Sequence, residues 1–342
     1  MYDEKYAEID QENLYQVMTN MPDQLTDGLG LSRELVLSGD FEYLVLSGMG
    51  GSALSAELLK IYLDETINKE RKGNPIRILI NRGYTLPQEA FNSQCLNILS
   101  SYSGNTEETL SSFQEVLENK LPALVIASGG KLMEMAKENS VPFILLPSGI
   151  QPRMGMGYSF SALIGVLMKL GILPDKTEEL KVAKIEIIKN LEVFEEKGKE
   201  MVACVHGQTP VIYASERLKS IAMIWKIMFN ENSKTPAFWN FFPELNHNEM
   251  VGFNNPQANF SLIILRDELD HPRNLRRFQM TESLLKNYGL KVALVDAPSG
   301  EVIFKIFALL QIGCFASYHL ALAYETDPTP VNMVERFKGL LE

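Results

Sequence analysis

The sequence has few cysteines, few histidines and fewer positive than negative charges. Its 342 residues include three cysteines, which are scattered along the chain and lack metal-ligand spacing. Such usage excludes a disulfide framework and favours a reducing compartment, so we expect a cytoplasmic protein. Lys and Arg number 32 against 43 Asp and Glu, a net charge of −11 at pH 7, which argues against non-specific binding to nucleic acid. An anionic ligand must therefore be met by local donors.

Signals for export or membrane insertion are also weak. The first ten residues, MYDEKYAEID, are acidic and polar, unlike a signal peptide. The most apolar stretch, VIFKIFALLQIGCFASYHLALAY, is interrupted by Lys305, Gln311 and His319. A buried core helix is therefore favoured over a membrane span, and we expect no membrane partner.

Short apolar runs without polar alternation recur through the first half of the sequence, which is typical of strands buried on both faces. Between them lie patterns with helical spacing of apolar residues, such as ALSAELLKIYL and TLSSFQEVLENKL. Strands and helices in alternation predict parallel βαβ units with a sheet covered on both faces. The runs span residues 43–48, 76–81, 95–101, 123–128 and 142–148.

The alternation is interrupted over residues 156–200, where the pattern is mostly helical and, in its second part, highly charged. It resumes with apolar runs at 210–215, 260–267 and 290–297. We therefore predict an α/β protein of two tandem, doubly wound, parallel-sheet domains, which is about the number that this length allows. The predicted parts are a first domain over residues 1–155, a helical bridge over 156–200 and a second domain over 201–342.

The stretch SGMGGSALSAELL (47–59) joins a predicted strand to a predicted helix. Its glycines permit a positive φ and a close approach of the backbone. The N–H groups that begin the helix, at Gly51 and Ser52, suit an anion. The stretch lacks the Gly-Lys ending of a nucleotide P-loop, and Ala53 stands where a dinucleotide fingerprint has its third glycine. Taken as structure alone, it is a tight turn between strand and helix.

The stretch SYSGNTEETL (101–110) is a second join of this kind. One hydroxyl would suffice to cap the helix that follows, but Ser101, Ser103 and Thr106 are all present. In a parallel sheet both joins lie at the carboxyl ends of strands, where ligands bind. Preorganised neutral donors from two such joins can hold a small anion. We therefore predict that these hydroxyls bind a phosphate monoester.

Six stretches, taken in order, are similar to motifs of a known family. The first two resemble the sugar isomerase (SIS) domain, and all six together resemble the bifunctional phosphoglucose/phosphomannose isomerases. That resemblance implies two SIS domains of flavodoxin-like fold, a homodimer, hexose 6-phosphate substrates and no metal or organic cofactor. The stretches are GMGGSA, SYSGNTEET, QPRMGMGYSF, FNENSK, ELNHNE and TDPTPVNMVERFK.

The resemblance also implies roles for individual residues. The phosphate site falls on Gly51, Ser52, Ser101, Ser103 and Thr106. The catalytic groups fall on Arg153, Glu231, His247 and Lys338, and His247 is implied to reach the active site of the partner subunit. Two departures are visible: Met154 stands where a small residue is expected, and the turn after PVIYAS in the second domain has no glycines. The second departure predicts that only the first domain binds phosphate.

These roles match the chemistry of aldose–ketose isomerisation. A single carboxylate, Glu231, can move a proton between C1 and C2 through a cis-enediol. Ring opening needs an acid and a base, for which His247 and Lys338 are candidates, although Lys338 could instead donate to the sugar oxygens. The polar neighbours of His247 could set its tautomer and raise its pKa. Arg153 can stabilise negative charge on the enediol oxygens. Taken as structure alone, Glu231 is a surface glutamate and Arg153 a loop arginine in a salt bridge.

Two other functions fit parts of the sequence. A phosphosugar sensor without catalytic activity would need the serine-rich joins but not Glu231, His247 or Lys338. A DNA-binding sensor would also need a basic helix-turn-helix region, which the acidic first forty residues do not supply. An amidotransferase isomerase half would normally follow a glutaminase domain with an N-terminal cysteine, whereas the first cysteine here is Cys95.

Overall fold

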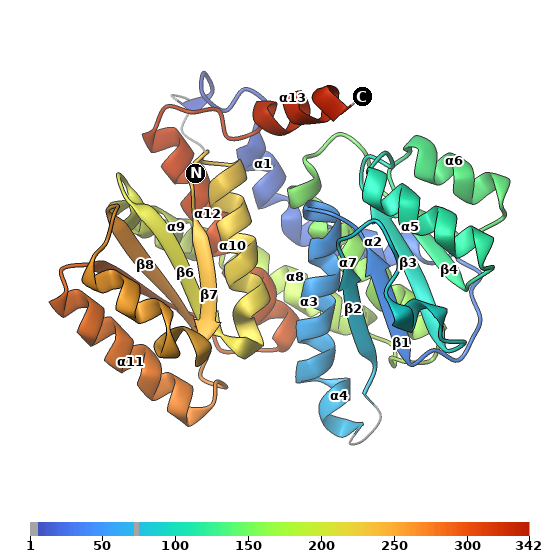
Figure 1. Ribbon diagram of the computed structural model, residues 1–342, viewed down its shortest axis with the longest axis horizontal. Helices are drawn as coiled ribbons and strands as arrows, with labels where there is room; N and C mark the ends of the chain where they lie inside the picture. The colour runs from blue at the N-terminus through green and yellow to red at the C-terminus, as the bar shows by residue number, and fades with distance from the viewer. Residues whose placement is uncertain (1–5, 72–74, 342) are drawn as a thin grey trace. The chain divides into compact units, whose positions relative to one another are not determined.

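The computed structural model describes residues 6–71 and 75–341 and contains two compact units (Figure 1). The N-terminal unit comprises residues 20–186, and the C-terminal unit comprises residues 1–19 together with 187–342. This division differs from the expected boundaries at residues 155 and 200. The reason is that helix α7 (Met156–Lys169), expected in a bridge, is almost entirely buried and packs against helices of the N-terminal unit.

The N-terminal unit contains a parallel sheet of five strands in the order β2-β1-β3-β4-β5. The central strand, β3, is buried at every residue because helices cover both faces of the sheet. The strands are β1 (Tyr43–Ser47), β2 (Arg77–Asn81), β3 (Cys95–Ser101), β4 (Ala123–Ala127) and β5 (Phe143–Leu145).

Helices of the N-terminal unit pack on both faces of this sheet. Helix α3 contacts strands β1, β2 and β3 and packs against α7, which in turn packs against α2. On the other face, Phe113 of α5 and Leu132 of α6 join a core cluster with Val45, Leu99 and Val125 of the strands. The helices besides α7 are α2 (Gln24–Leu31), α3 (Gly51–Glu65), α4 (Ile67–Glu70), α5 (Glu107–Glu118), α6 (Gly130–Glu138) and α8 (Thr177–Lys189).

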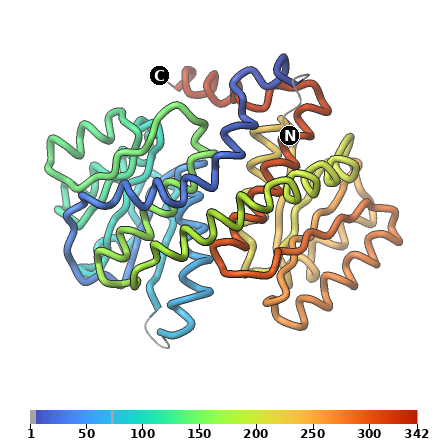
Figure 2. The backbone as a smooth tube through the Cα atoms, turned by 180° about the vertical axis from the view of Figure 1, so that it is seen from behind, coloured from blue at the N-terminus to red at the C-terminus, as the bar shows by residue number. Residues whose placement is uncertain are grey.

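The C-terminal unit contains a parallel sheet of four strands in the order β7-β6-β8-β9. Helix α10 contacts β6 and β7, and α12 packs against α10 and α9 (Figure 2). Phe278 and Leu285 of α11 join the core cluster on the other face. The strands are β6 (Thr209–Ser215), β7 (Phe238–Phe242), β8 (Phe260–Arg266) and β9 (Lys291–Asp296), and the helices are α1 (Leu14–Thr19), α9 (Leu191–Val205), α10 (Lys219–Glu231), α11 (Pro272–Asn287), α12 (Val302–Ala323) and α13 (Asn332–Leu341).

Two parallel sheets flanked by helices confirm the predicted α/β fold class. Every expected strand is present with similar bounds. Strand β7, with the sequence FWNFF, was not expected as a strand. It lies at the edge of its sheet and is only partly buried, so its apolar and aromatic run fits a core segment or an interface equally well.

The long apolar stretch near the end of the sequence forms helix α12. Its length and composition would suffice to cross a membrane, but 89% of its most apolar window is buried inside the protein. The expectation of a core helix is therefore confirmed. All three cysteines are thiols, and burial raises the pKa of the Cys95 thiol to about 11. Unbridged thiols fit the predicted reducing compartment, while the cytoplasmic location stays a prediction.

A buried carboxylate, Glu195 of α9, ties three segments of the C-terminal unit together. Tyr15 donates its hydroxyl to Glu195 at 2.9 Å, while Lys199 Nζ and His319 Nε2 of α12 lie 3.1 and 3.2 Å from its other oxygen. Burial raises the pKa of Glu195, but these donors outweigh that effect and lower the pKa to about 2. His319 therefore has the structural role that its place in an apolar helix indicates.

We expect the free energy of unfolding to fall as the pH is lowered from about 5 towards 2. In that window the unfolded chain takes up a proton at Glu195 that the folded chain does not. Glu195→Gln should cost about 1–3 kcal/mol at neutral pH, because it removes hydrogen bonds to a charged group. The substitution should also make the free energy of unfolding less dependent on pH over this window. Urea unfolding at a series of pH values measures both effects.

Glu196→Gln is the matched control, because Glu196 is the next residue of α9 and is exposed, with one ion pair to the same lysine. It should leave the acid slope unchanged. Equal slopes for the two variants would contradict the role assigned to Glu195.

Candidate functional site

The first corner of the candidate site is the turn between β1 and α3. Helix α3 begins at Gly51, after Gly50 with its positive φ of 49°. A Cβ placed on Gly51 would lie 2.6 Å from the backbone nitrogen of Arg153, closer than real Cβ contacts allow. Glycine is therefore required at residue 51, because the turn that carries Arg153 packs directly on the first turn of α3.

The second corner is the turn between β3 and α5, which contains the predicted hydroxyls. The Ser101 and Thr106 hydroxyl oxygens lie 2.8 Å apart, and the Gly104 N–H donates to Ser101 at 3.1 Å. Ser101 is buried at 1% exposure, whereas Ser103 is exposed and accepts the Asn105 N–H at 3.2 Å. Two of the three hydroxyls thus converge, while Ser103 is bonded within its own turn.

A direct hydrogen bond joins the two corners. The Tyr102 N–H donates to the Ser52 hydroxyl at 2.8 Å, and the Ser100 hydroxyl donates to the Ser52 carbonyl at 3.0 Å. The amino ends of α3 and α5 therefore lie at the same edge of the sheet, as expected for joins that follow neighbouring parallel strands. We call these two joined corners, residues 48–52 and 101–106, the cradle.

Arg153 lies beside the cradle in a short 3₁₀ turn (Pro152–Met154) and is 1% exposed. Gln24, buried on α2, holds this turn by donating to the Met154 carbonyl at 2.8 Å and accepting the Gly157 N–H at 3.1 Å. Met154 itself is fully buried, so the unit accommodates the larger side chain. Gln24 was missed from the sequence, because its partners lie more than a hundred residues away.

Glu231, in the C-terminal unit, is the last residue of α10. The residues that follow it are anchored rather than solvated: Asn232 donates to the Ser317 hydroxyl of α12 at 2.9 Å, and Ser233 donates to the Phe229 carbonyl at 2.7 Å. Lys234 donates to the Glu231 carbonyl at 2.7 Å and to the Pro328 carbonyl at 3.1 Å. The polar stretch NENSK is thus partly buried and is held by hydrogen bonds.

His247 is exposed, at the end of a 3₁₀ turn (Glu244–His247) that follows β7. The hydrogen bonds of its polar neighbours hold the loop, whereas the sequence predicts that these neighbours act on the imidazole ring. Asn246 bonds to Thr281 and Arg277 of α11 at 3.0 and 3.1 Å, and Asn248 donates to Glu244 at 2.7 Å.

Glu249, two residues after His247, anchors the same loop on the other side of the histidine. Its carboxylate accepts the Tyr213 hydroxyl of β6 at 2.5 Å and also accepts the Asn240 amide of β7. Burial, followed by the charge of Glu249, raises the pKa of Tyr213, so this phenol stays protonated as a donor. The loop around His247 is therefore fixed on both sides of an exposed imidazole.

The C-terminal unit places the predicted catalytic groups at different edges of its sheet. Because β6 and β7 are parallel, α10 returns the chain to the amino edge, and Glu231 lies there. His247 follows the carboxyl end of β7, at the opposite edge. Lys338 lies on α13, whose residues are exposed, and its ammonium lies 2.8 Å from Glu335. The fold of this unit does not bring His247 to Glu231.

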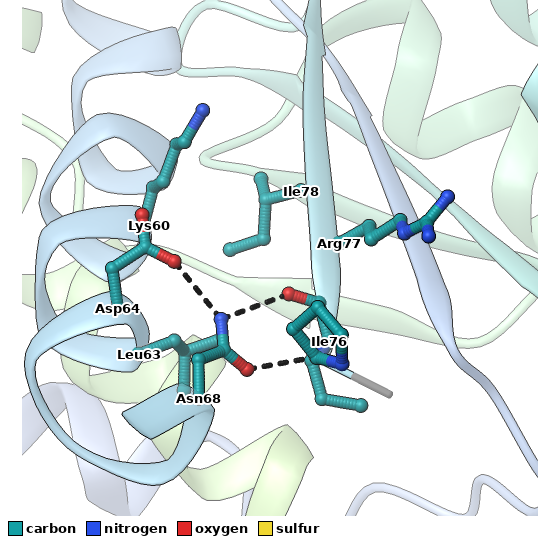
Figure 3. A pocket seen from close by; sticks show the side chains of 8 residues that line it. Lys60, Leu63, Asp64, Asn68, Ile76, Arg77 and Ile78 are labelled. Carbon is teal, nitrogen blue, oxygen red and sulfur yellow. Dashed lines mark hydrogen bonds between the residues drawn. The ribbon is translucent and has the colours of Figure 1, made fainter. Parts of the chain in front are cut away.

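A cavity of about 290 Å³ lies elsewhere in the N-terminal unit (Figure 3). In the wall of this cavity, Asn68 of α4 donates to Asp64 and to the Ile76 carbonyl. The cavity lies at the amino end of β2, whereas the cradle lies at the carboxyl ends of β1 and β3. Within residues 6–71 and 75–341, no group of three or more His, Cys, Asp or Glu side chains could hold a metal ion.

The chain is similar to known enzymes along most of its length. The chain is 34% identical to the bifunctional phosphoglucose/phosphomannose isomerase of Caldicellulosiruptor bescii, over 96% of this chain and 98% of that protein. It is also 34% identical to the enzyme of the same name from Aquifex aeolicus, over 88% and 91% of the two chains. A family model described as the bacterial phospho-glucose isomerase C-terminal SIS domain matches residues 194–341.

A solved structure extends the likeness to the fold. A hypothetical protein from Thermus thermophilus superposes with a TM-score of 0.71 over 95% of this chain and 88% of that chain, at 17% identity. At that identity the likeness concerns the fold alone, and it covers both units.

Gly51→Ala tests whether the close approach at the cradle matters for binding. The added Cβ would push α3 away from the Arg153 turn, so we expect the Kd for a hexose 6-phosphate to rise at least about tenfold, a change of roughly 1.4 kcal/mol. Isothermal titration of the variant and the parent measures this change.

Gly30→Ala is the matched control, because Gly30 lies in helix α2 and a Cβ there meets nothing within 4 Å. It should leave the Kd unchanged. An unchanged Kd in Gly51→Ala as well would show that the sugar phosphate binds outside the cradle.

Proposed function

The chain belongs to the family of bifunctional phosphoglucose/phosphomannose isomerases, and we propose on this basis that it interconverts glucose 6-phosphate and mannose 6-phosphate with fructose 6-phosphate. The observation that carries the proposal is the match, at 34% identity, along almost the whole length of a relative with that name. The cradle and the Glu231 carboxylate offer groups of the kinds that the reaction requires, which supports the proposal.

The cradle is proposed to bind the phosphate group of the sugar. Its donors are neutral: the backbone at Gly51, the hydroxyls of Ser52, Ser103 and Thr106, and the amino ends of α3 and α5. Ser101, being buried, would act by orienting the Thr106 hydroxyl. Fixed neutral donors are suited to a chain with a net charge of −11, which offers no general attraction for anions.

Glu231 is proposed as the base that transfers the proton between carbons. In the open-chain aldose its carboxylate takes the proton from C2, the C–H electron pair forms the C1=C2 bond, and O1 gains a proton to give the cis-enediol. Return of the proton from Glu231 to C1, with loss of the proton on O2, gives the ketose. Because the glucose and mannose esters differ only at C2, return of the proton to either face of C2 would serve both.

Arg153 is proposed to stabilise the negative charge that develops on the enediol oxygens. Its backbone is fixed against Gly51, and its side chain is almost fully buried. A preorganised charge of this kind supplies about 3 kcal/mol of transition-state stabilisation. Lysine would substitute poorly, because it lacks the planar, directional guanidinium group.

His247 and Lys338 are proposed to open the sugar ring before isomerisation. Ring opening needs an acid at the ring oxygen and a base at the anomeric hydroxyl. Within one chain His247 and Glu231 lie at opposite edges of the same sheet. This separation favours a homodimer in which the partner subunit supplies the imidazole.

We expect the protein to form glucose 6-phosphate from fructose 6-phosphate without added metal, and to turn over mannose 6-phosphate as well. Glu231→Gln should lower kcat by about 10²–10⁴-fold for both aldoses, because it removes the base, while leaving Kd largely intact. A coupled assay measures turnover, and titration measures binding.

Glu178→Gln, on the exposed side of α8, is the control for general effects of charge loss. Binding without turnover by the parent protein would favour the sensor. Loss of binding in Glu231→Gln would show that the base has been misassigned.

Mixed dimers test whether His247 acts across the interface. Glu231→Gln and His247→Ala subunits should each be inactive, but a mixed dimer would contain one site with neither substitution. Random reassociation should then restore about a quarter of the parent activity, since about half of the dimers are mixed and each has one intact site. Activity after denaturation and joint refolding is the measurement.

A mixture of Glu231→Gln with Glu231→Ala subunits is the control and should stay inactive. If the two different variants also stay inactive together, His247 does not act across the interface.

A further inference from the structure

The two sheets share one topology, which identifies the counterpart of the cradle in the C-terminal unit. In each sheet the first strand lies between the next two strands of the chain: β1 lies between β2 and β3, and β6 lies between β7 and β8. The cradle is built by the turns that follow β1 and β3. The corresponding turns in the C-terminal unit follow β6 and β8 and comprise residues 215–218 and 267–271. We call them the second corner pair.

Ion pairs between side chains join the two turns of the second corner pair, whereas neutral hydrogen bonds join the two turns of the cradle. Arg217, after β6, lies with Nη2 2.7 Å from Asp267 Oδ2 and Nε 3.3 Å from Asp270 Oδ1, both after β8. Lys305 of α12 lies with Nζ 2.8 Å from Asp267 Oδ1. The Leu269 N–H donates to that oxygen at 3.1 Å. One carboxylate is thus held by two cations and a backbone amide.

Burial makes this arrangement costly unless every charge is paired. The side chains of Asp267, Asp270 and Lys305 are 1–7% exposed, and that of Arg217 is 21% exposed. Burial raises the pKa of Asp267, but hydrogen bonds from Lys305 and Arg217 outweigh it and lower the pKa, so the carboxylate is ionised. Ser215, the last residue of β6, adds a buried hydroxyl for which no partner is found in the described part of the chain.

We propose that the Asp267 carboxylate is a built-in anion that occupies the place in the C-terminal unit where the cradle of the N-terminal unit would bind phosphate. Two cations and an amide N–H form the donor set of an anion site, and the chain fills it with its own side chain. The proposal deepens the proposed function, on which it rests only for the role of the cradle. It predicts that the C-terminal unit binds no phosphate of its own, so that one chain binds one phosphosugar.

Removal of the Asp267 side chain should open a second phosphate site. Asp267→Ala vacates the space between Arg217 and Lys305, and leaves Arg217 paired with Asp270 and Lys305 paired with the exposed Glu268, each at 3.3 Å. The probe is inorganic phosphate, with bound phosphate per chain measured by equilibrium dialysis at constant ionic strength. We expect the variant to bind one more phosphate per chain than the parent, with a Kd of about 1 mM or tighter, and to unfold at a higher temperature in phosphate than in chloride.

Gly51→Ala, alone and combined with Asp267→Ala, separates this site from the cradle. If the cradle binds no phosphate, the parent shows no site, and the proposed function loses support. Asp267→Ala should still add one site in that case. If Asp267→Ala adds no phosphate site either to the parent or to Gly51→Ala, the proposal of a built-in anion is overturned, whether or not the cradle binds phosphate.

Asp296→Ala is the matched control, because Asp296 forms a bidentate pair with Arg266 at the ends of β9 and β8 but is 64% exposed. It should add no phosphate site. An equal increment in this control would mean that any freed arginine collects phosphate, and the proposal would fail.

A stability measurement covers the case in which Asp267→Ala does not fold. Asp267→Asn removes the charge but keeps the shape, and Asp267→Asn with Lys305→Met removes a cation as well. If the carboxylate acts as counter-ion, the double variant should have a higher urea midpoint than Asp267→Asn alone. Additive losses from the two substitutions would overturn the proposal.

Discussion

The N-terminal unit depends on a close approach between two backbones. At Gly51 the first turn of α3 lies against the Pro152–Arg153 turn with no room for a Cβ. The next residue, Ser52, accepts the Tyr102 N–H and so joins the turn after β3 to the same helix end. Two consecutive residues of one helix therefore hold three chain segments together. The predicted phosphate donors and the predicted cation share one position because of this contact.

The two sheets have the same order over four strands but carry different groups at the carboxyl ends of corresponding strands. In the N-terminal unit, glycines and hydroxyls leave neutral donors at the carboxyl ends of the strands. In the C-terminal unit, Arg217 and Lys305 meet Asp267 at the corresponding place. The neutral donors of the cradle are proposed to bind a phosphate ester, whereas the charges of the buried ion network are already paired with one another. A likeness of fold therefore does not imply a likeness of function between the two units.

The C-terminal unit presents Glu231 and His247 on supports that are held by hydrogen bonds. Asn232 and Ser233 anchor the residues after Glu231 to buried partners, and Glu249 and Asn246 anchor the loop around His247. These supports lie at opposite edges of one sheet, because α10 carries the chain back from the carboxyl edge to the amino edge. If Glu231 and His247 act on one substrate, as proposed, their separation within a chain is suited to assembly from two chains.

The sequence by itself determined the elements and most of the cradle. Apolar runs without alternation identified eight strands, because strands buried on both faces exclude polar side chains. The glycine and serine turns after β1 and β3 were predicted as joins, since parallel strands end at one edge. Edge strand β7 was missed, because a partly buried aromatic run such as FWNFF has no pattern that distinguishes a strand from an interface.

Only the tertiary structure decided which polar residues meet. Gln24 with Met154, Ser52 with Tyr102, Asn246 with Thr281 and Lys305 with Asp267 are pairs separated by 35 to 130 residues. No local pattern marks such pairs, because a hydrogen bond depends on where the folded backbone places two side chains. For the same reason the sequence could not predict the partners of the polar residues beside His247. They are adjacent to the histidine in sequence, but they form hydrogen bonds that hold the loop. Spacing along the chain selects helices and strands, whereas packing selects partners.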